Sequence, residues 1–521
     1  MGEIQVLDCT LRDGGRCFGN TWGDTTIKSI SKGLSDAGID IIEIGFLWYI
    51  ADGICRENST HFRSFQEIEE FLCPDQNYAA YIEYEVFKKG VYSIVPKEKS
   101  SITGIRLGVL KEDIKESLTL MEDIIDKGYQ LYVQGINTLS YTEDELLDFV
   151  QIINTVKPYA FAIVDTFGNM QQQDLIEKFQ LIDKNLDKNI AIAFHSHNNK
   201  NQSMELAKTF ATISEERDIV IDSTLMGIGM GAGNLSTELI TKYLNQEKEK
   251  NYDISILQDL INKYIVKFRD KFVWGCTAVS IDSAKTWRSQ IDVSYITTEY
   301  KYLTMELQRY LLAMCAIGRG TALGKIDGYA KLLLAPFPSK SDYKELQKHF
   351  IGKKIVIVGR GPSVTKNKEK LAAFGQENDA IFVYINAHER NVLGIDSHEI
   401  YYFFSRENGY EFFRKENVEE TVITLAGFKQ TQVSKGREYT IHVRQCTENV
   451  EQVADDGVMW MLNLLHGMKN QCEVFVAGFD GGDAGGLQIE KYRDCIENIR
   501  KDVSLSFLTE SVYEEKGNSI L

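Results

Sequence analysis

The sequence predicts an α/β protein built from a (β/α)8 barrel, a helical appendage and a second, open α/β domain. Short apolar segments alternate with amphipathic ones up to about residue 246, helical spacing alone follows, and the alternation resumes from residue 352. A chain of 521 residues is too long for one hydrophobic core. We therefore place a barrel domain at 1–248, the helical appendage with a linker at 249–350, and a Rossmann-like, doubly wound domain at 351–521.

The barrel is predicted from eight apolar segments, which is the number of strands that closes such a ring. Helical segments such as TIKSISKGLSDAG and KESLTLMEDIIDKG lie between most of them. The third unit is irregular, because residues 47–90 form an insertion rich in aromatic and acidic residues in which we place no helix. The expected strands are residues 3–9, 40–46, 91–95, 104–110, 130–136, 159–165, 189–197 and 219–225.

Candidate metal ligands follow two of these strands. Asp13 lies in LDCTLRDGG after the first strand, and His195 and His197 lie in AIAFHSHNN at the end of the seventh. Only strand eight separates strands one and seven in a closed ring, so the three side chains can meet at the rim where barrel enzymes hold their active sites. Three protein ligands leave positions open for substrate or water, which favours a catalytic metal over a structural one.

Strand parity supports this interpretation. Side chains alternate with a period of two along a strand, so His195 and His197 point to the same side as the small alanines of AIAFHSH. Asp13 shares its parity with Cys9 and Leu11. A polar turn is the competing interpretation of an isolated His-x-His, with about equal weight, and the strand context and the preceding RDG favour the metal.

A glycine-rich loop, GIGMGAGNLSTE, follows strand eight and contains Gly227, Gly229, Gly231 and Gly233. Such a loop lets backbone N–H groups approach an anion, and the following helix N-terminus adds a favourable dipole. A flexible connection is the alternative. Asn234 at the end of the loop is either a fourth metal ligand or the N-cap of the next helix, and both interpretations stay open here.

The segment from about residue 251 to 350 changes character. ISILQDLINKYIVKF and TTEYKYLTMELQRYLLAMCAIG have helical apolar spacing without strand alternation, which predicts a helical appendage packed on the barrel. LLLAPFPSKSD contains two of the six prolines and is typical of a linker into a third domain.

The C-terminal domain is predicted because apolar strand segments again alternate with helical ones from residue 352. GRGPS, at 359–363, comes at the end of its first strand. Open α/β domains bind phosphate-bearing ligands at such a position, so Gly359, Gly361, Ser363 and Asp480 are ligand candidates. A tight strand-to-helix turn is an equally weighted alternative. The expected strands are residues 353–359, 379–387, 399–405, 421–427, 438–444 and 473–480.

Composition excludes several classes of protein. A net charge of −17 and a pI near 5.1 argue against a nucleic-acid partner, which requires clustered Lys and Arg. We find neither a signal peptide nor a membrane-spanning run and expect a soluble, cytoplasmic protein without a membrane partner. Nine cysteines without CxxC spacing favour reduced core residues over a disulfide framework or a zinc ribbon.

Five motifs in order, LDCTLRDGG, IEIGF, VDTFGN, FHSHNN and GMGAGN, resemble the HMG-CoA-lyase-like metal-dependent TIM barrels, most closely the 4-hydroxy-2-oxovalerate aldolase branch. The resemblance covers about residues 3–245. It implies Mn²⁺ or Mg²⁺, with Zn²⁺ less favoured, held by Asp13, His195 and His197 with Asn234 as an extra ligand. It further implies an enolate-stabilising, substrate-binding Arg12, supporting catalytic roles for Glu43 and Asp165, and substrate contacts at Asn199, Gly231 and Gly233.

The resemblance implies a metal-dependent aldolase that cleaves a 4-hydroxy-2-oxo acid through a pyruvate-like enolate, in a homodimer or larger homo-oligomer. An acyl-CoA lyase or condensing enzyme of the same superfamily is the first alternative. A non-haem iron oxygenase fits less well, because those enzymes commonly use His-x-Asp on a different fold. A non-catalytic barrel fused to a domain that binds a nucleotide-sugar is the third alternative.

One position departs from the aldolase pattern. The branch is expected to have a proton-transferring histidine four residues beyond the motif arginine, and here that residue is Arg16. Arginine stays protonated near neutral pH and cannot act as a general base. Either a tyrosine, a metal-bound water or another group takes the proton, or the substrate differs. His61 is a candidate substitute, although a surface histidine is the more common case.

The third domain more faintly resembles bacterial motility-associated glycosyltransferase-like and pterin-diphosphokinase-like domains. The matching segments are VIVGRGPS, the DDGVMWMLNLL helix and FVAGFDGG. This resemblance implies an anionic ligand, a nucleotide or nucleotide-sugar, and a role in surface-carbohydrate assembly. It is an analogy of fold, from which function does not follow directly.

Overall fold

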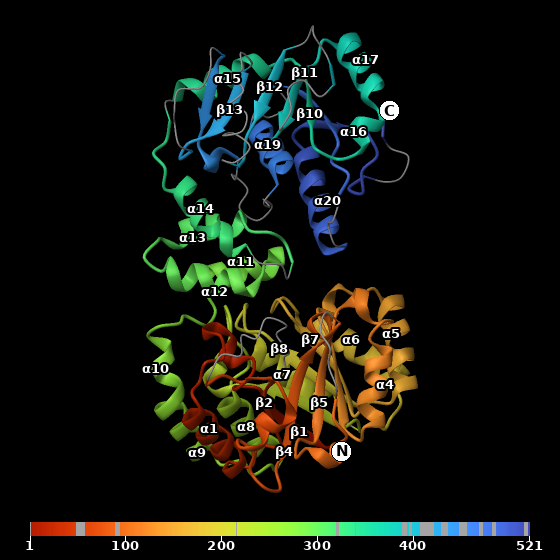
Figure 1. The fold of residues 1–521 in the computed structure, drawn as a ribbon, viewed down its shortest axis with the longest axis vertical. Coiled ribbons are helices and arrows are strands. Elements are labelled where there is room, and N and C mark those ends of the chain that lie inside the picture. Colours follow the sequence, from red (N-terminus) through yellow and green to blue (C-terminus); the bar gives the residue numbers. More distant parts are fainter. Residues whose placement is uncertain are drawn as a thin grey trace. The chain divides into compact units, whose positions relative to one another are not determined.

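The structure is a computed structural model of the 521-residue chain (Figure 1). The chain forms two compact units: Met1–Lys285 with Val293–Glu299, and Thr286–Asp292 with Tyr300–Leu521. The residues that the structure describes are 2–47, 58–88, 94–214, 216–318, 322–338, 340–387, 393–394, 399–406, 421–428, 436–446, 456–467, 472–481, 486–514 and 519–521.

The first unit contains a closed ring of eight parallel strands, which confirms the predicted barrel. The order around the ring is β1-β9-β8-β7-β6-β5-β4-β2, with β2 pairing back to β1 and the short β3 attached to β2. Only β9 therefore separates β8, which leads to the two histidines, from β1, which leads to Asp13, as predicted. The strands are β1 (Ile4–Asp8), β2 (Ile41–Leu47), β3 (His61–Phe62), β4 (Asn77–Glu83), β5 (Gly104–Val109), β6 (Gln130–Gly135), β7 (Ala160–Asp165), β8 (Ala191–Ser196) and β9 (Ile219–Ser223).

The third barrel strand was predicted in the wrong place. It is β4, which lies inside the segment interpreted as an irregular insertion and pairs with β2 and β5. Of the predicted strand at 91–95, residues 91–93 lie outside the described residues, and Ile94 and Val95 are not in a strand. β4 has the sequence NYAAYIE, whose adjacent alanines and tyrosines are buried on both faces and so lack polar alternation.

Helices surround the ring of strands (Figure 1). Some have clear initiation signals: Thr142 accepts a hydrogen bond from the backbone of Glu145, and the Glu145 carboxylate accepts one from Thr142, which forms a capping box. The helices are α1 (Asp24–Asp36), α2 (Phe65–Glu69), α3 (Tyr84–Phe87), α4 (Leu118–Asp126), α5 (Glu143–Val156), α6 (Gln172–Asn185), α7 (Ser203–Ile213) and α8 (Thr237–Glu247).

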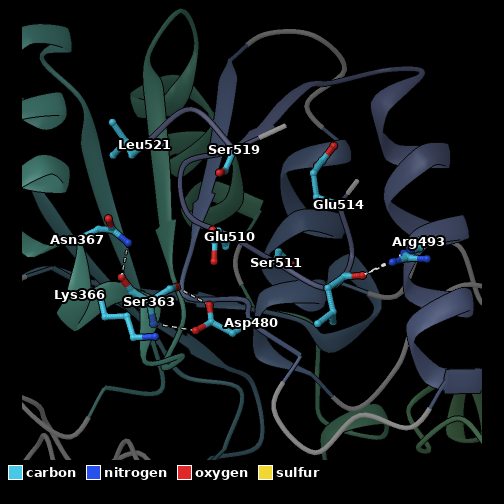
Figure 2. A pocket seen from close by; sticks show the side chains of 11 residues that line it. Ser363, Lys366, Asn367, Asp480, Arg493, Glu510, Ser511, Glu514, Ser519 and Leu521 are labelled. Carbon is cyan, nitrogen blue, oxygen red and sulfur yellow. Dashed lines mark hydrogen bonds between the residues drawn. The ribbon is translucent and has the colours of Figure 1, made fainter. Parts of the chain in front are cut away.

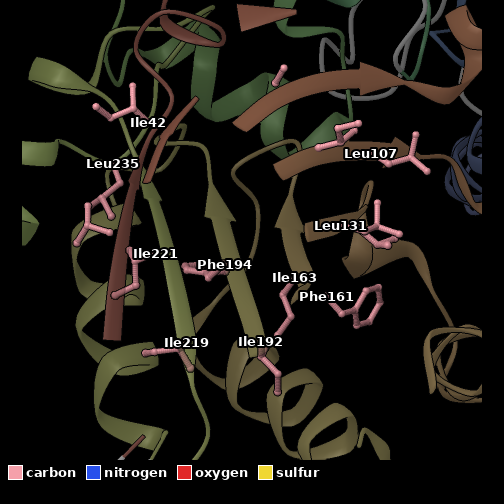
Figure 3. Packing of buried hydrophobic residues seen from close by; sticks show 14 of the residues in the cluster. Ile42, Leu107, Leu131, Phe161, Ile163, Ile192, Phe194, Ile219, Ile221 and Leu235 are labelled. Carbon is pink, nitrogen blue, oxygen red and sulfur yellow. The ribbon is translucent and has the colours of Figure 1, made fainter. Parts of the chain in front are cut away.

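The barrel strands separate two hydrophobic layers. Ile192 and Phe194 on β8 belong to the large outer cluster, which also contains helix residues such as Phe210 (Figure 3). Ala191 and Ala193 alternate with them and belong to a smaller cluster, made almost entirely of strand residues, which fills the interior of the ring. The predicted inward direction of these alanines, and hence of His195, is confirmed.

The described residues between 251 and 350 form helices and connecting turns without a strand. The first of them, α9, packs against α1 and α8 and belongs to the barrel unit, whereas α13 to α15 belong to the second unit. The elements are α9 (Ile254–Leu260), a π-helical turn (Ile261–Ile265), α10 (Val266–Arg269), α11 (Ala278–Thr286), α12 (Gln290–Glu299), α13 (Met305–Ala313), α14 (Leu323–Leu333) and α15 (Lys340–Phe350).

The second unit contains a parallel sheet with the order β14-β13-β12-β11-β10-β15-β16. The strand order reverses beside β10, so the carboxyl ends of β10 and β15 flank a switch point, where open α/β sheets place their ligands. Six of the strands were predicted, and β16 was missed because SLSF is short and half polar. The strands are β10 (Lys354–Val358), β11 (Ile381–Ile385), β12 (Ile400–Phe403), β13 (Thr421–Leu425), β14 (Glu438–Ile441), β15 (Glu473–Ala477) and β16 (Ser504–Phe507).

Four helices of this sheet are α16 (Ser363–Lys366), α17 (Lys368–Asn378), α19 (Gly457–His466) and α20 (Gly486–Arg500). Throughout the described part of the chain, no helix combines the length and the hydrophobicity needed to span a membrane. No disulfide joins the eight cysteines in that part either.

Candidate metal centre

Asp13 reaches the rim of the barrel through a turn. β1 ends at Asp8, and the carbonyl oxygen of Cys9 then accepts hydrogen bonds from the backbone N–H groups of Arg12 and Asp13, at 3.1 and 2.8 Å. The predicted parity of Asp13 with Cys9 and Leu11 is therefore wrong. Cys9 lies in the inner cluster and Leu11 in the outer one, because the strand has already ended between them.

Asp13, His195 and His197 come together at this rim. One ligand atom from each lies within 4.8 Å of the others. The distance from His195 Nε2 to Asp13 Oδ2 is 4.0 Å. It is too long for a hydrogen bond and suits two ligands of one ion, whose bonds to nitrogen and oxygen are about 2.0–2.2 Å long.

Hydrogen bonds set the tautomers of both histidines. His195 Nδ1 lies 2.9 Å from Asp222 Oδ2, and His197 Nδ1 lies 3.3 Å from the carbonyl oxygen of Gly233. A carbonyl oxygen and an ionised carboxylate only accept, so Nδ1 carries a proton in each ring and Nε2 is the nitrogen that remains to bind a metal. Burial lowers the pKa of the half-buried His197 to about 4, more than nearby Asp13 raises it. This ring is therefore neutral, as a metal ligand must be.

Asn234 lies beside Asp13. Its amide nitrogen donates to Asp13 Oδ2 at 2.9 Å and to the Ile228 carbonyl at 3.0 Å. Its buried Oδ1 has no hydrogen-bond partner among the described residues, and buried side-chain oxygens are seldom left so. The alternative N-cap role falls to another residue, because α8 begins at Thr237 and Ser236 precedes it. The residues present thus fit a divalent ion with three or four protein ligands.

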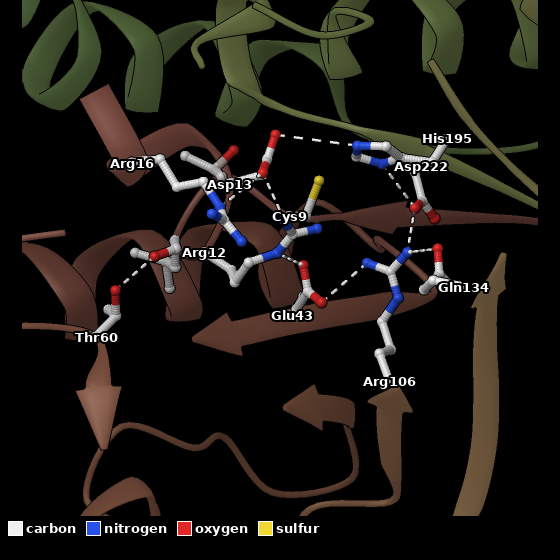
Figure 4. A network of polar contacts seen from close by, with 12 residues as sticks. Cys9, Arg12, Asp13, Arg16, Glu43, Thr60, Arg106, Gln134, His195 and Asp222 are labelled. Atoms are coloured by element: carbon white, nitrogen blue, oxygen red, sulfur yellow. Dashed lines mark hydrogen bonds and ion pairs between the residues drawn. The ribbon is translucent and has the colours of Figure 1, made fainter. Parts of the chain in front are cut away.

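A buried chain of charges lies beside these ligands (Figure 4). Arg12 is 5% exposed; its Nη1 lies 2.5 Å from Asp13 Oδ1 and its Nε lies 2.7 Å from Glu43 Oε2. The guanidinium also lies over the ring of Tyr81, 4.5 Å from its centroid. Burial by itself would raise the pKa of Asp13, but Arg12 and the nearby histidines and Arg16 together outweigh it and hold that pKa well below its usual range.

Two members of this chain of charges were not predicted from the sequence. Arg106 on β5 contacts Glu43 and Asp222, and it donates to Gln134 at 3.0 Å. Burial would raise the pKa of Asp222, but Arg106 and then His195 lower it. A signal was present: each charge lies inside an apolar strand, GIRLGVL or IVIDSTL, and buried charges in such strands require partners.

Comparison with known proteins agrees with this geometry. Residues 3–263 match the family model described as HMGL-like, which is half of the chain. The chain belongs to the HMGL-like family. The family predicted from the five motifs is thereby confirmed.

Relatives of this HMGL-like chain are aldolases and lyases. A 4-hydroxy-2-oxovalerate aldolase of Pelotomaculum thermopropionicum is 23% identical over 278 residues, which cover 49% of this chain and 73% of the aldolase. An oxaloacetate decarboxylase of Mycobacterium tuberculosis is 25% identical over 254 residues, covering 47% and 70%. The solved HMG-CoA lyase of Brucella melitensis is 14% identical with a TM-score of 0.41, covering 52% of this chain and 100% of the lyase.

The other predicted residues of the HMGL-like barrel bind to backbone or to neighbouring helices. The Asn199 amide nitrogen donates to the Ser280 carbonyl and to Ser283 Oγ, at 3.0 and 2.9 Å, so it is committed to α11. Gly233 has a φ of 74°, and a Cβ there would lie 2.1 Å from a backbone oxygen. Its carbonyl orients His197, while Gly231, with a φ of 59°, shapes the same loop.

Asp165 lies at the end of β7, where its carboxylate accepts hydrogen bonds from the backbone N–H groups of Asn169 at 2.9 Å and Met170 at 3.2 Å. Burial raises its pKa from 3.8 to about 6, more than these hydrogen bonds lower it. The folded protein therefore binds this proton more tightly than the unfolded chain does. Well below pH 4 the carboxyl group is protonated in both states and does not lower the free energy of unfolding. As the pH rises to 6 and above, ionisation is easier in the unfolded chain, and the free energy of unfolding falls.

We expect Asp165→Asn to remove this pH-dependent cost. The free energy of unfolding of the wild type, minus that of the variant, should fall by about 2 kcal/mol between pH 4 and 6.5, which is most of the roughly 3 kcal/mol that a shift of about two pKa units represents. Urea unfolding of both proteins, followed by circular dichroism at several pH values, measures the difference. A difference independent of pH would show that Asp165 titrates near its ordinary value.

Arg16 lies beside Asp13 in the candidate centre. Its Nε lies 3.3 Å from Asp13 Oδ1, one of its terminal nitrogens lies 3.8 Å from Glu83 Oε2, and its guanidinium lies over the ring of Phe46 at 4.8 Å. His61 stacks on the same Phe46, with ring centroids 4.9 Å apart and planes at 14°. His61, on β3, therefore packs against a ring that Arg16 also contacts.

The C-terminal ligand candidates also come together, at the ends of β10 and β15 (Figure 2). Ser363 donates from its backbone N–H to Asp480 Oδ2 at 2.8 Å and from its hydroxyl to Oδ1. The N–H groups of Gly359 and Gly361 donate to carbonyl oxygens of residues 477 and 478, both at 2.8 Å. The N–H groups of Gly359, Gly361 and Ser363 are thus occupied, and the geometry matches the alternative of a strand-to-helix turn.

A cavity of about 750 Å³ lies beside this turn and contains charged side chains of both signs. A nucleotide or nucleotide-sugar bound there would contact side chains rather than the backbone of GRGPS. The lining residues include Ser363, Lys366, Asp480, Arg493, Glu510 and Glu514.

Proposed function

We propose that the barrel is a divalent-metal-dependent aldolase that cleaves a 4-hydroxy-2-oxo acid into pyruvate and an aldehyde. The proposal rests on one observation: potential ligand atoms of Asp13, His195 and His197 converge beside a buried arginine. The unpartnered Oδ1 of Asn234 is consistent with a fourth ligand. Aldolases and lyases among the relatives support the same class of reaction.

The reaction needs charge stabilisation at one place. When the bond between C3 and C4 breaks, its electron pair enters the 2-oxo group and yields the enolate of pyruvate. A divalent ion at the candidate centre would supply positive charge to the oxygens that become negative. Arg12 is held by Asp13 and Glu43, so its guanidinium can face the same oxygens without having to reorganise.

The proton of the 4-hydroxyl group needs an acceptor, and Arg16 cannot provide it. We propose His61 for this role, because its ring stacks on the phenyl group that Arg16 also covers. The proton would return to C3 of the enolate and complete the pyruvate product.

Decarboxylation of oxaloacetate is a second candidate function, and Arg16 is the observation that favours it. Loss of CO₂ from C3 forms the same enolate of pyruvate without removing a proton from a hydroxyl group. A general base is therefore unnecessary, and the position of Arg16 places positive charge near a dicarboxylate. One of the relatives is an oxaloacetate decarboxylase.

We expect the full-length protein to release pyruvate in the presence of Mn²⁺ and to stop when EDTA removes the metal. Pyruvate is measured with lactate dehydrogenase and NADH, using 4-hydroxy-2-oxovalerate and oxaloacetate as separate substrates. Activity on the hydroxy acid that is lost in His61→Ala supports the aldolase. Activity on oxaloacetate alone, unchanged in His61→Ala, supports the decarboxylase, and pyruvate from neither substrate would refute both.

A further inference from the structure

Arg106 lies at the centre of the buried chain of charges and contacts two carboxylates at once (Figure 4). Its side chain is 1% exposed, and Nη1 lies 2.9 Å from Glu43 Oε1 while the other terminal nitrogen pairs with Asp222. The three residues come from β5, β2 and β9, so they converge only inside the closed ring.

Each of these carboxylates also contacts a different functional side chain. Asp222 Oδ2 lies 2.9 Å from His195 Nδ1. Glu43 Oε2 lies 2.7 Å from Arg12 Nε. The buried chain of charges therefore connects His195, through Asp222, Arg106 and Glu43, to Arg12. Arg12 also pairs with Asp13, so the contacts lead back to a second candidate ligand.

We propose that Arg106 is a positioning residue that orients His195 through Asp222 and Arg12 through Glu43. This inference rests on the proposed function for the role of Arg12. One arginine then sets both the direction of a metal-ligand lone pair and the position of the guanidinium beside the enolate.

A purely structural ion pair would not need this arrangement. A buried arginine is already neutralised by one carboxylate, and a buried pair by itself adds little net stability. Arg106 instead joins two carboxylates that also contact functional side chains. Glu43 Oε2 pairs with Arg12, and Asp222 Oδ2 contacts both Arg106 and His195. Partners behind a metal-binding histidine fix its tautomer and ring orientation, and their loss typically weakens metal affinity by about 10–100-fold.

The test uses three variants of the full-length protein and two separate measurements. The variants are Asp222→Asn, Glu43→Gln and Arg106→Gln, and Asp8→Asn is the matched control, a buried barrel carboxylate that binds Thr10 and Thr237 instead. Mn²⁺ affinity is measured by calorimetry, and kcat for pyruvate release is measured at saturating Mn²⁺.

The two measurements should distinguish the role of Asp222, which contacts His195, from that of Glu43, which contacts Arg12. Asp222→Asn should weaken Mn²⁺ binding by about 10–100-fold with kcat nearly unchanged. Glu43→Gln should lower kcat by a similar factor with Mn²⁺ binding nearly unchanged, and Arg106→Gln should impair both. Arg106→Lys, which keeps one charge but reaches one carboxylate, should rescue only one of the two losses.

The tautomer of His195 provides a readout that simple loss of packing would not change. In the metal-free wild type, ¹⁵N NMR should show the proton on Nδ1, and Asp222→Asn and Arg106→Gln should both shift it toward Nε2. The signal is assigned by its absence in His195→Gln.

Unchanged Mn²⁺ affinity and an unchanged tautomer in Arg106→Gln would overturn the inference. An equal loss of Mn²⁺ affinity and of kcat in all three variants and in Asp8→Asn would also overturn it, because such a result indicates general destabilisation. The failure of the proposed function is distinguishable, because a wild type that releases no pyruvate can still be tested for Mn²⁺ affinity and for the His195 tautomer.

Discussion

Replacing His195 by alanine is expected to abolish metal-dependent pyruvate release and to reduce Mn²⁺ affinity more than the loss of any residue that supports the ligands from behind. The variant loses a ligand whose Nε2 lies 4.0 Å from Asp13 Oδ2, leaving two protein ligands from the close cluster. Loss of an outer partner typically costs about 10–100-fold in metal affinity, so loss of the ligand itself should exceed this range. Calorimetry with Mn²⁺ and the pyruvate assay measure the two effects.

A matched control is available in His349→Ala, which removes an exposed histidine of the second unit. This variant should bind Mn²⁺ and release pyruvate like the wild type. Turnover that survives in His195→Ala at wild-type rates would mean that the Asp-His-His cluster does not serve the reaction.

Replacing Arg12 by lysine is expected to lower kcat by about 10²–10³-fold while Mn²⁺ affinity changes by less than a few-fold. The guanidinium uses two different nitrogens for Asp13 and Glu43 while its plane covers Tyr81, and a lysine ammonium cannot reproduce that geometry. The positive charge next to Asp13 remains, so the metal ligand stays ionised.

Arg63→Lys serves as its control, because Arg63 pairs with Glu67 at an exposed position. Steady-state kinetics at saturating Mn²⁺ separate kcat from metal binding. An equal fall in kcat and in Mn²⁺ affinity would assign Arg12 to the assembly of the centre rather than to the enolate.

Much of the barrel could be predicted from the sequence, because seven of its strands are continuous apolar runs. β4 could not, since the tyrosines and alanines of NYAAYIE resemble an irregular insertion more than a buried strand. The last C-terminal strand, SLSF, was not predicted either, because four residues are too few to show a clear alternation of apolar and polar side chains.

The candidate centre was predicted as far as short-range patterns extend. His195 lies on β8, His197 comes one residue after its end, and Asp13 follows another strand, so spacing and topology were sufficient. The partners of these side chains come from distant parts of the chain: Asp222 is 27 residues from His195, and Arg106 is 116 from Asp222. No local pattern shows which buried charges will meet, and the parity argument failed for Asp13 because a turn intervenes.

The hydrogen bond from Asn234 to Asp13 spans 221 residues and joins the two ends of the barrel sequence. Contacts of such high sequence separation form late in folding, because the loop they close must be ordered first. The donor set is therefore complete only after β1 has paired with both β9 and β2. A divalent ion that binds only the finished set would favour the closed ring over partly assembled barrels by mass action. Metal concentration would then set the half-life of the barrel against proteolysis as well as its rate of turnover.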